Sequence, residues 1–232
     1  SSSKTFLKHV LNEKSLLNAE PAPIVDCKLR LIDPYRIEAI SKHREWESHR
    51  NNLDHSVISG AHEPRVKQQI PKSLIELKSI TLREMNSTRD HIYSGYVLSV
   101  AIIDATHSWT PSIHLVIEDE NLDCERIGIY GFTKEQGEYL TSKVYTIGSK
   151  MNIINPYLRI GASDIKPFIR IDDFSSILMQ SESERVINMC RCCGEPNALH
   201  ACRKCKQARY CSKECQTMDW QLYKHKLICK NQ

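Results

Sequence analysis

The sequence lacks an apolar run of about 18 residues, the length that a membrane span needs, so we expect no membrane contact. Three common catalytic patterns are also missing: Gly-x-Ser-x-Gly, the P-loop and Gly-x-Gly-x-x-Gly. The paired acids at 118–120 and 172–173 are interpreted as solvated turns. We therefore predict a protein that is not an enzyme and has no catalytic or organic-cofactor-binding residues.

No apolar run follows the opening residues Ser1-Ser2-Ser3-Lys4, so we expect no secretory signal peptide. The 10 cysteines are then expected as thiols or metal ligands in a reducing compartment, not as disulfides. This predicts an intracellular location, in the nucleus or the cytoplasm. A chain of 232 residues has room for one medium-sized domain and one small one.

Seven cysteines and one histidine near the C-terminus fall into four close pairs. The pairs are Cys190 and Cys193, Cys202 and Cys205, Cys211 and Cys215, and His225 and Cys229. Zinc takes four thiolate or imidazole ligands in a tetrahedron, so eight ligands predict two zinc ions. A disulfide framework is the alternative, but a histidine at ligand spacing favours zinc. Cys192 is ambiguous, and the isolated Cys27 and Cys124 are expected to be buried thiols.

Residues 190–229 resemble a MYND-type zinc finger. The ligand pairs carry the resemblance, together with Tyr210-Cys211-Ser212, Cys215-Gln216, Asp219-Trp220 and His225-Lys226. In that family the pairs interleave. The resemblance implies one zinc ion on Cys190, Cys193, Cys211 and Cys215, and a second on Cys202, Cys205, His225 and Cys229. The spacing between Cys215 and His225 is longer than usual, and we expect a longer helical segment there instead of a lost site.

Short helices are expected around the last ligands. Ser212 can cap a helix over 213–218, and Asp219 can cap a second helix that starts at Trp220. His225 and Cys229 would then lie on one face of that second helix. We expect Trp220 and Leu227 to form a small apolar plug, with contact to a partner as the alternative.

Positive charge is concentrated at this end of the chain. Residues 190–232 carry nine Lys and Arg against three acids, a formal +6, whereas the whole chain carries +4. Two zinc ions and seven thiolates together lower that +6 to about +3. The charge therefore gives little support for nucleic-acid binding, which depends on phosphate contacts.

The rest of the chain divides into a helical segment and a β-rich region. Residues 4–18 and 34–50 have helical patterns, and the polar segment 51–72 is typical of a linker. A helix is expected at 133–145, and strands are expected at 97–103, 113–117, 126–132, 150–159 and 168–172. The predicted parts are a helical N-terminal segment and linker at 1–72, a β-barrel at 73–180, a linker at 175–189 and a zinc finger at 186–232.

Three strands, a helix and two strands follow the element order of an OB-fold, a five-stranded barrel. Residues 70–180 also resemble the OB-like region of large MYND proteins with TPR and SET domains, on the runs IPKSLIELKSITLREM, VIEDENLDCERIGIYGF and INPYLRIG. The resemblance implies an α+β fold: a small OB-like β-barrel with N-terminal helices plus a two-zinc MYND-type finger. In those proteins the region precedes a lysine methyltransferase domain, whose SET motifs are absent from this sequence.

An OB-type barrel can bind single-stranded nucleic acid through aromatic and basic residues on its second and third strands. Tyr130 and Phe132 share one face of the expected third strand, and Trp109 precedes the second. Residues 113–132, however, carry five acids against one arginine, and such a hairpin repels phosphate. Nucleic-acid binding is therefore not expected.

The predicted function is a protein–protein interaction module that binds two Zn²⁺ ions. MYND-type fingers are similar in recognising short proline-containing peptides, often in transcriptional regulation, which implies a regulatory protein partner here. The candidate peptide-binding residues are Tyr210, as an exposed ring, Gln216 and Trp220. The alternatives are the non-catalytic part of a SET-type protein lysine methyltransferase and an adaptor for single-stranded nucleic acid.

Overall fold

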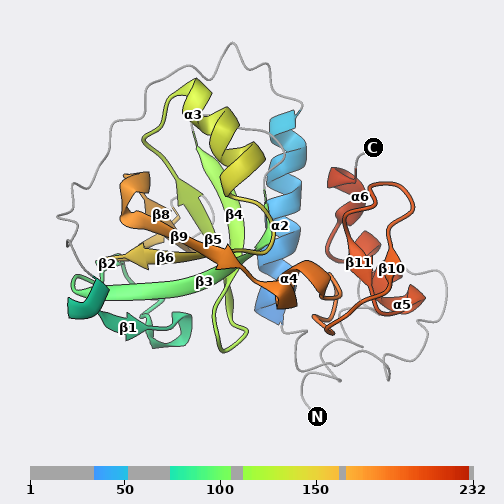
Figure 1. Cartoon of the computed structure of the whole chain (residues 1–232), viewed down its shortest axis with the longest axis horizontal. Helices are drawn as coiled ribbons and strands as arrows, with labels where there is room; N and C mark the ends of the chain where they lie inside the picture. The colour runs from blue at the N-terminus through green and yellow to red at the C-terminus, as the bar shows by residue number, and fades with distance from the viewer. Residues whose placement is uncertain (1–33, 52–73, 106–111, 162–165, 230–232) are drawn as a thin grey trace. The chain divides into compact units, whose positions relative to one another are not determined.

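A computed structural model describes residues 34–51, 74–105, 112–161 and 166–229 of the chain (Figure 1). The chain forms two compact units. Among the described residues, the finger unit combines 34–48 with 184–229, and the sheet unit takes those between 49 and 183. The expected helix at 4–18, most of the linker at 51–72, Cys27 and Trp109 lie outside the described residues. Within the described part, no helix combines the length and apolar character needed to cross a bilayer.

One sheet organises the sheet unit. Its strands are β1 (Lys78–Ile80), β2 (His91–Ile92), β3 (Tyr96–Asp104), β4 (Ile113–Glu118), β5 (Cys124–Ile129), β6 (Ser149–Ile154), β7 (Tyr157–Ile160), β8 (Pro167–Ile171) and β9 (Ile177–Glu182). They pair in the order β2-β7-β8-β5-β4-β3-β6-β9, with β1 parallel to β3 beside this path. The path is open, so the expected closed OB-like barrel is not confirmed. The mixed composition of helix and sheet is as predicted.

Alternating apolar side chains on the central strands build the core of this unit. The core-facing residues of three of these strands are at most 5% exposed: Leu98, Val100, Ile102, Ile113, Leu115, Ile117, Ile127 and Ile129. Burying one such side chain contributes about 1.5–3 kcal/mol to folding, before entropy is counted. β4 and β5 pair antiparallel in the register that this alternation requires, so the predicted hairpin is confirmed.

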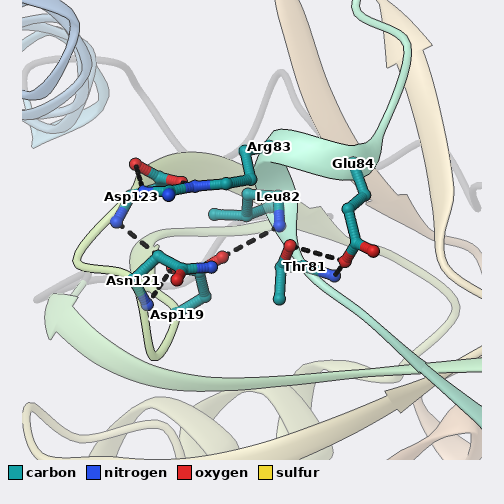
Figure 2. Close-up of polar contacts among 7 residues, drawn as sticks. All are labelled: Thr81, Leu82, Arg83, Glu84, Asp119, Asn121 and Asp123. Atoms are coloured by element: carbon teal, nitrogen blue, oxygen red, sulfur yellow. Dashed lines mark hydrogen bonds and ion pairs between the residues drawn. The ribbon is translucent and has the colours of Figure 1, made fainter.

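A buried carboxylate closes the turn between β4 and β5 (Figure 2). Asp119 is 3% exposed, and its Oδ1 accepts from the backbone N–H groups of Asn121 at 2.9 Å and Asp123 at 3.1 Å. Its Oδ2 accepts from the N–H of Leu82 at 2.9 Å, which ties the turn to the 3-10 helix η5 (Leu82–Glu84). Burial raises the pKa of Asp119, and these three N–H groups oppose part of the rise. The interpretation as a solvated turn is therefore wrong here.

The second acidic pair is also part of the structure. Arg170 and Asp172 are both buried and form an ion pair at 2.6 Å. Asp173 caps the 3-10 helix η7 (Phe174–Ser176), because its carboxylate accepts from the N–H of Ser175 at 2.9 Å. Both acids therefore fix the chain that leads from β8 into β9, and the expectation of a merely solvated turn is corrected.

The predicted linker and one predicted helix have different bounds in the structure. The predicted linker at 175–189 instead forms β9, which pairs antiparallel with β6, and helix α4 (Glu184–Asn188). Beyond Ile177 every side chain of β9 is exposed, so the strand carries no alternating signal. The expected helix at 133–145 is present as α3 (Lys134–Tyr139), capped by Thr133, and continues as the π-helical turn η6 (Leu140–Val144).

The return strand β5 ends earlier than expected because of a glycine. Gly131 has φ +81°, and a Cβ placed there would lie 2.4 Å from the carbonyl oxygen of Asp172. That backbone approach brings the chain after β5 against the end of β8, where the N–H of Tyr130 donates to the carbonyl of Ile171 at 2.8 Å. A side chain cannot be accommodated at Gly131 without moving the end of β8.

Gly131→Ala should lower the free energy of unfolding by about 3 kcal/mol or more, because a left-handed backbone and a backbone clash act together. Gly95→Ala is the matched control. Gly95 has φ +82°, but no atom lies within 4 Å of the position that a Cβ would take, so we expect a loss of only about 1 kcal/mol. Urea unfolding followed by circular dichroism measures both. Equal losses for the two variants would contradict the role assigned to the contact with Asp172.

Candidate metal centre

Two tight turns place the first four predicted ligands. In each Cys-x2-Cys pair, the residue after the second cysteine donates its N–H to the carbonyl of the first. Gly194 donates to Cys190 at 2.8 Å, and Lys206 donates to Cys202 at 2.9 Å. Both donors have positive φ, 73° and 61°. The left-handed residue turns the chain back so that both thiols of a pair lie on one side.

A small hairpin and two helices carry the remaining ligands. β10 (His200–Ala201) pairs with β11 (Arg209–Tyr210), and Cys211 follows directly. Ser212 caps α5 (Lys213–Gln221) by accepting from the N–H of Cys215 at 3.2 Å, as predicted. The second helix is α6 (His225–Ile228).

The expected helix break at Asp219 is absent. α5 continues through Asp219 to Gln221, and α6 begins only after Lys224, which has φ 57°. Asp219 is fully buried and uses its carboxylate for side-chain contacts instead of capping. The long spacing between Cys215 and His225 is therefore taken up by a longer α5 and its following turn.

The first ligand cluster contains Cys190, Cys193, Cys211 and Cys215. Their sulfur atoms lie within 4.8 Å of one another. The Sγ of Cys211 is 3.6 Å from that of Cys193 and 3.5 Å from that of Cys215. Three of the four residues are buried, and Cys211 is half-buried.

The second ligand cluster contains Cys202, Cys205, His225 and Cys229, all buried, with ligand atoms again within 4.8 Å of one another. The Sγ atoms of Cys202 and Cys229 are 3.7 Å apart. The Nε2 of His225 is 3.6 Å from the Sγ of Cys205, so Nε2 is the nitrogen that faces the cluster. The two clusters reproduce the interleaved pairing that the resemblance implied.

The geometry of both clusters fits zinc. Zn–S bonds of about 2.3 Å in a tetrahedron place two sulfur atoms about 3.8 Å apart, and a ligating imidazole nitrogen about 3.6 Å from a sulfur. The observed separations of 3.5–3.7 Å match these edges. Each cluster could therefore hold one zinc ion. Four protein ligands per ion close the tetrahedron and leave no position for a catalytic water.

The thiols of the clusters differ in acidity. Hydrogen bonds from Cys193 and Cys215 lower the pKa of Cys190 to about 2, despite its burial. Burial raises the pKa of Cys229 to about 12, and burial also raises that of Cys211. Crowded thiols therefore do not ionise together without a cation. A divalent ion supplies the positive charge that permits all of them to be thiolates.

A comparison with known families confirms that the segment carrying the eight ligands resembles a MYND-type finger. Residues 190–229 match the model of the MYND finger family. This segment is a MYND finger. The match does not extend to residues 70–180, so the resemblance of that region to TPR- and SET-containing MYND proteins is not confirmed.

Three relatives are similar over a short stretch of this chain, about the length of the finger. Programmed cell death protein 2 of Rattus norvegicus is 57% identical over 42 residues, which is 18% of this chain and 12% of the relative. Egl nine homolog 1 of Homo sapiens is 44% identical over 50 residues, 22% of this chain and 11% of the relative. Dauer abnormal formation protein 25 of Caenorhabditis elegans is 48% identical over 44 residues, which is 19% of this chain and 11% of the relative. The matches thus span about an eighth of each relative or less.

The structure changes the roles of the candidate peptide-binding residues. Tyr210 is fully buried, and its hydroxyl donates to Oδ2 of Asp219 at 2.7 Å, so the expectation of an exposed ring is wrong. Trp220 is 36% exposed and Leu227 is 39% exposed, so they do not form the expected buried plug. Gln216 is half-buried on α5.

Residues outside the ligand set complete the finger unit, and sequence patterns did not indicate that they belong to it. Helix α2 (Pro34–Asn51), expected at 34–50, belongs to this unit and not to a separate N-terminal part. Arg44 on α2 forms an ion pair with Asp219 at 2.6 Å. No spacing rule connects two residues that are 175 positions apart. Cys192 and Cys124 are buried thiols outside both clusters, as expected for Cys124.

The aromatic residues considered as a stacking platform for nucleic acid are engaged within the sheet unit. The guanidinium of Arg170 lies 4.4 Å from the ring centroid of Tyr130, and His114 meets the same ring edge-on at 6.2 Å. Phe132 is partly buried against the apolar core. Tyr130 and Phe132 therefore serve internal packing.

The zinc content tests the ligand assignment. Elemental analysis after gel filtration should give two zinc ions per chain, because the eight ligands form two separate clusters. The double variant Cys211→Ser, Cys215→Ser removes half of the first cluster and should retain about one ion. The matched variant Cys124→Ser alters a buried thiol outside the clusters and should retain both. A wild-type ratio near one, or full retention by the double variant, would contradict the assignment.

Proposed function

We propose that the finger binds a short, extended, proline-containing segment of a partner protein on the outer face of α5. MYND fingers are known as protein-interaction modules, and this general role applies to residues 190–229. The particular binding mode is argued from two side chains on α5, Gln216 and Trp220.

Trp220 is the observation that carries the proposal. A large aromatic ring that is 36% exposed on a small domain presents an apolar surface next to polar atoms. The ring meets His225 edge-on, with centroids 6.0 Å apart, so a residue of the second ligand cluster packs against it. An aromatic ring held in one orientation is the usual surface on which a proline ring packs.

Gln216 adds a polar group to the same surface. It stands four residues before Trp220 on α5, so the two side chains lie on one face of the helix. A glutamine amide can donate to and accept from the backbone of an extended peptide. Together the two residues combine a hydrogen-bonding group with an apolar platform. Tyr210 acts beneath this surface, through Asp219, and not by contact with the peptide.

The partner is proposed to be a regulatory protein inside the cell, in the nucleus or the cytoplasm. The reducing environment that free thiols and zinc ligands require supports the intracellular location. The relatives' names, which refer to cell death, to Egl nine and to dauer formation, have no common process. These names therefore point to no particular pathway. The proposal is limited to a mode of binding and to a role in regulation, such as that of transcription.

Trp220→Ala and Gln216→Ala should each reduce binding to an array of short synthetic peptides that contain proline. The loss for Trp220→Ala should be about tenfold or more, because a central aromatic contact contributes at least about 1.4 kcal/mol. Fluorescence anisotropy with the best peptide of the array measures the change in affinity. A proline-to-alanine version of that peptide should bind as weakly as the variants do.

Three controls accompany this measurement. Zinc content must stay at the wild-type value, because Trp220 contacts His225. Leu199→Ala removes an apolar side chain that is 82% exposed but not on α5, and should leave binding unchanged. The double reversal Lys204→Glu, Lys206→Glu should also have little effect. If those reversals abolish a tight complex with single-stranded oligonucleotides at physiological salt, the peptide proposal is wrong and the nucleic-acid adaptor is favoured.

We also propose that this chain binds and does not catalyse. Closed zinc coordination supports this, because it offers no open metal position to a substrate. The alternative is that the chain forms the non-catalytic part of a SET-type protein lysine methyltransferase. The purified chain, incubated with a labelled methyl donor and histones, should transfer no label. Transfer that a chelator abolishes would overturn the proposal and identify an enzyme.

A further inference from the structure

A buried ion pair joins helix α2 to the finger. Nη1 of Arg44 donates to Oδ1 of Asp219 at 2.6 Å and to the carbonyl oxygen of Tyr223 at 2.9 Å. The side chains of Arg44 and Asp219 are 3% and 0% exposed. Two charges removed from water to this degree are tolerated only because they pair with each other. The helix near the N-terminus is therefore an internal part of the finger unit.

The second oxygen of Asp219 faces a zinc ligand. Oδ2 lies 3.8 Å from Nδ1 of His225, while Nε2 of the same ring faces the Sγ of Cys205 at 3.6 Å. When Nε2 binds a metal, Nδ1 carries the proton of the ring, and a carboxylate on that side orients the imidazole. The hydroxyl of Tyr210 donates to the same Oδ2 at 2.7 Å and helps to fix the carboxylate.

Helix α2 also holds the backbone turn that leads into His225. Three consecutive residues before this ligand each have a partner on α2. The hydroxyl of Ser41 donates to the carbonyl of Leu222, Arg44 donates to the carbonyl of Tyr223, and Glu45 forms an ion pair with Lys224. The turn and the imidazole that follows it are thus both positioned from one helix.

We propose that Asp219 is a positioning residue for His225 and that α2, through Arg44, holds Asp219 and the turn at 222–224 in place. The second zinc site would then depend on α2, although none of the ligands of that site comes from this helix. Without Arg44, the buried carboxylate of Asp219 has lost its guanidinium partner and is driven toward water. The imidazole of His225 then loses the group that aligns it.

The test compares three variants of the full chain loaded with zinc. Arg44→Met removes the charge and keeps much of the apolar volume, and Asp219→Asn keeps the shape of the carboxylate but removes its charge. Arg83→Met is the matched control, because Arg83 forms an exposed ion pair with Asp123 at 2.7 Å in the sheet unit (Figure 2). Each is titrated with a chelator while the zinc that stays bound is counted.

Arg44→Met and Asp219→Asn should lose one of the two ions at a chelator concentration about 10- to 100-fold lower than the wild type, the usual effect of removing a residue that orients a ligand. Replacement of zinc by cobalt(II) should then show a weakened spectrum from the site with three thiolates and one imidazole, beside an unchanged spectrum from the all-thiolate site. Arg83→Met should match the wild type. Retention of both ions by the first two variants would overturn the proposal, and so would the simultaneous loss of both ions, which indicates unfolding of the whole finger.

Reciprocity gives a second test that uses no variant of α2. If α2 stabilises the second zinc site, zinc in that site must stabilise the seating of α2 by the same free energy. Cys202→Ser with Cys205→Ser empties the second site. Hydrogen exchange at the backbone amides of α2 should then be faster by a factor similar to the 10- to 100-fold change expected in the chelator titration. In the corresponding variant of the first site, Cys190→Ser with Cys193→Ser, exchange in α2 should change less. Equal exchange in α2 with and without the second ion would refute the coupling.

Discussion

Each zinc site joins two segments of the finger that are apart in the sequence, and the finger depends on this cross-linking. The first cluster connects the turn at 190–193 with the start of α5, and the second connects the turn at 202–205 with α6. Because the two connections interleave, each closes a loop that contains ligands of the other. A segment of about 40 residues cannot bury a core large enough for independent stability, so metal binding supplies much of its folding free energy.

The sheet unit is held by a different kind of interaction. Its central strands bury a continuous set of isoleucine, leucine and valine side chains, and polar groups serve mainly to fix the connections. Asp119 and Asp172 illustrate this use of charge, since one binds three backbone N–H groups and the other binds Arg170. Buried carboxylates with such partners define where a turn lies more than they add stability.

The ligand set could be predicted from the sequence because zinc imposes its spacing on the chain locally. The β4–β5 hairpin could be predicted because one buried face gives an alternating pattern. Barrel closure could not, because the order of elements does not determine which strands pair, and β5 pairs in parallel with β8. β9 has no alternating signal, because its pairing with β6 uses backbone groups while its side chains beyond Ile177 are exposed.

The burial of Tyr210 and the role of Asp219 depend on a partner outside the finger sequence. Arg44 pairs with the carboxylate of Asp219, which would be costly to bury without a cation. The hydroxyl of Tyr210 then donates to this carboxylate inside the unit. Local patterns therefore placed Tyr210 on the surface and Asp219 at a helix cap. An interaction of this range is visible only once both segments have been folded together.

The finger unit is built from two segments that are far apart in the sequence, and this separation also sets an order of events during synthesis. Arg44 precedes Asp219 by 175 residues, and at about 5–20 residues per second a ribosome needs roughly 10–35 s to add them. All of the sheet unit is made within that interval. The residues of α2 are therefore made before those of the finger, and Arg44 has no acidic counterpart until Asp219 has been added.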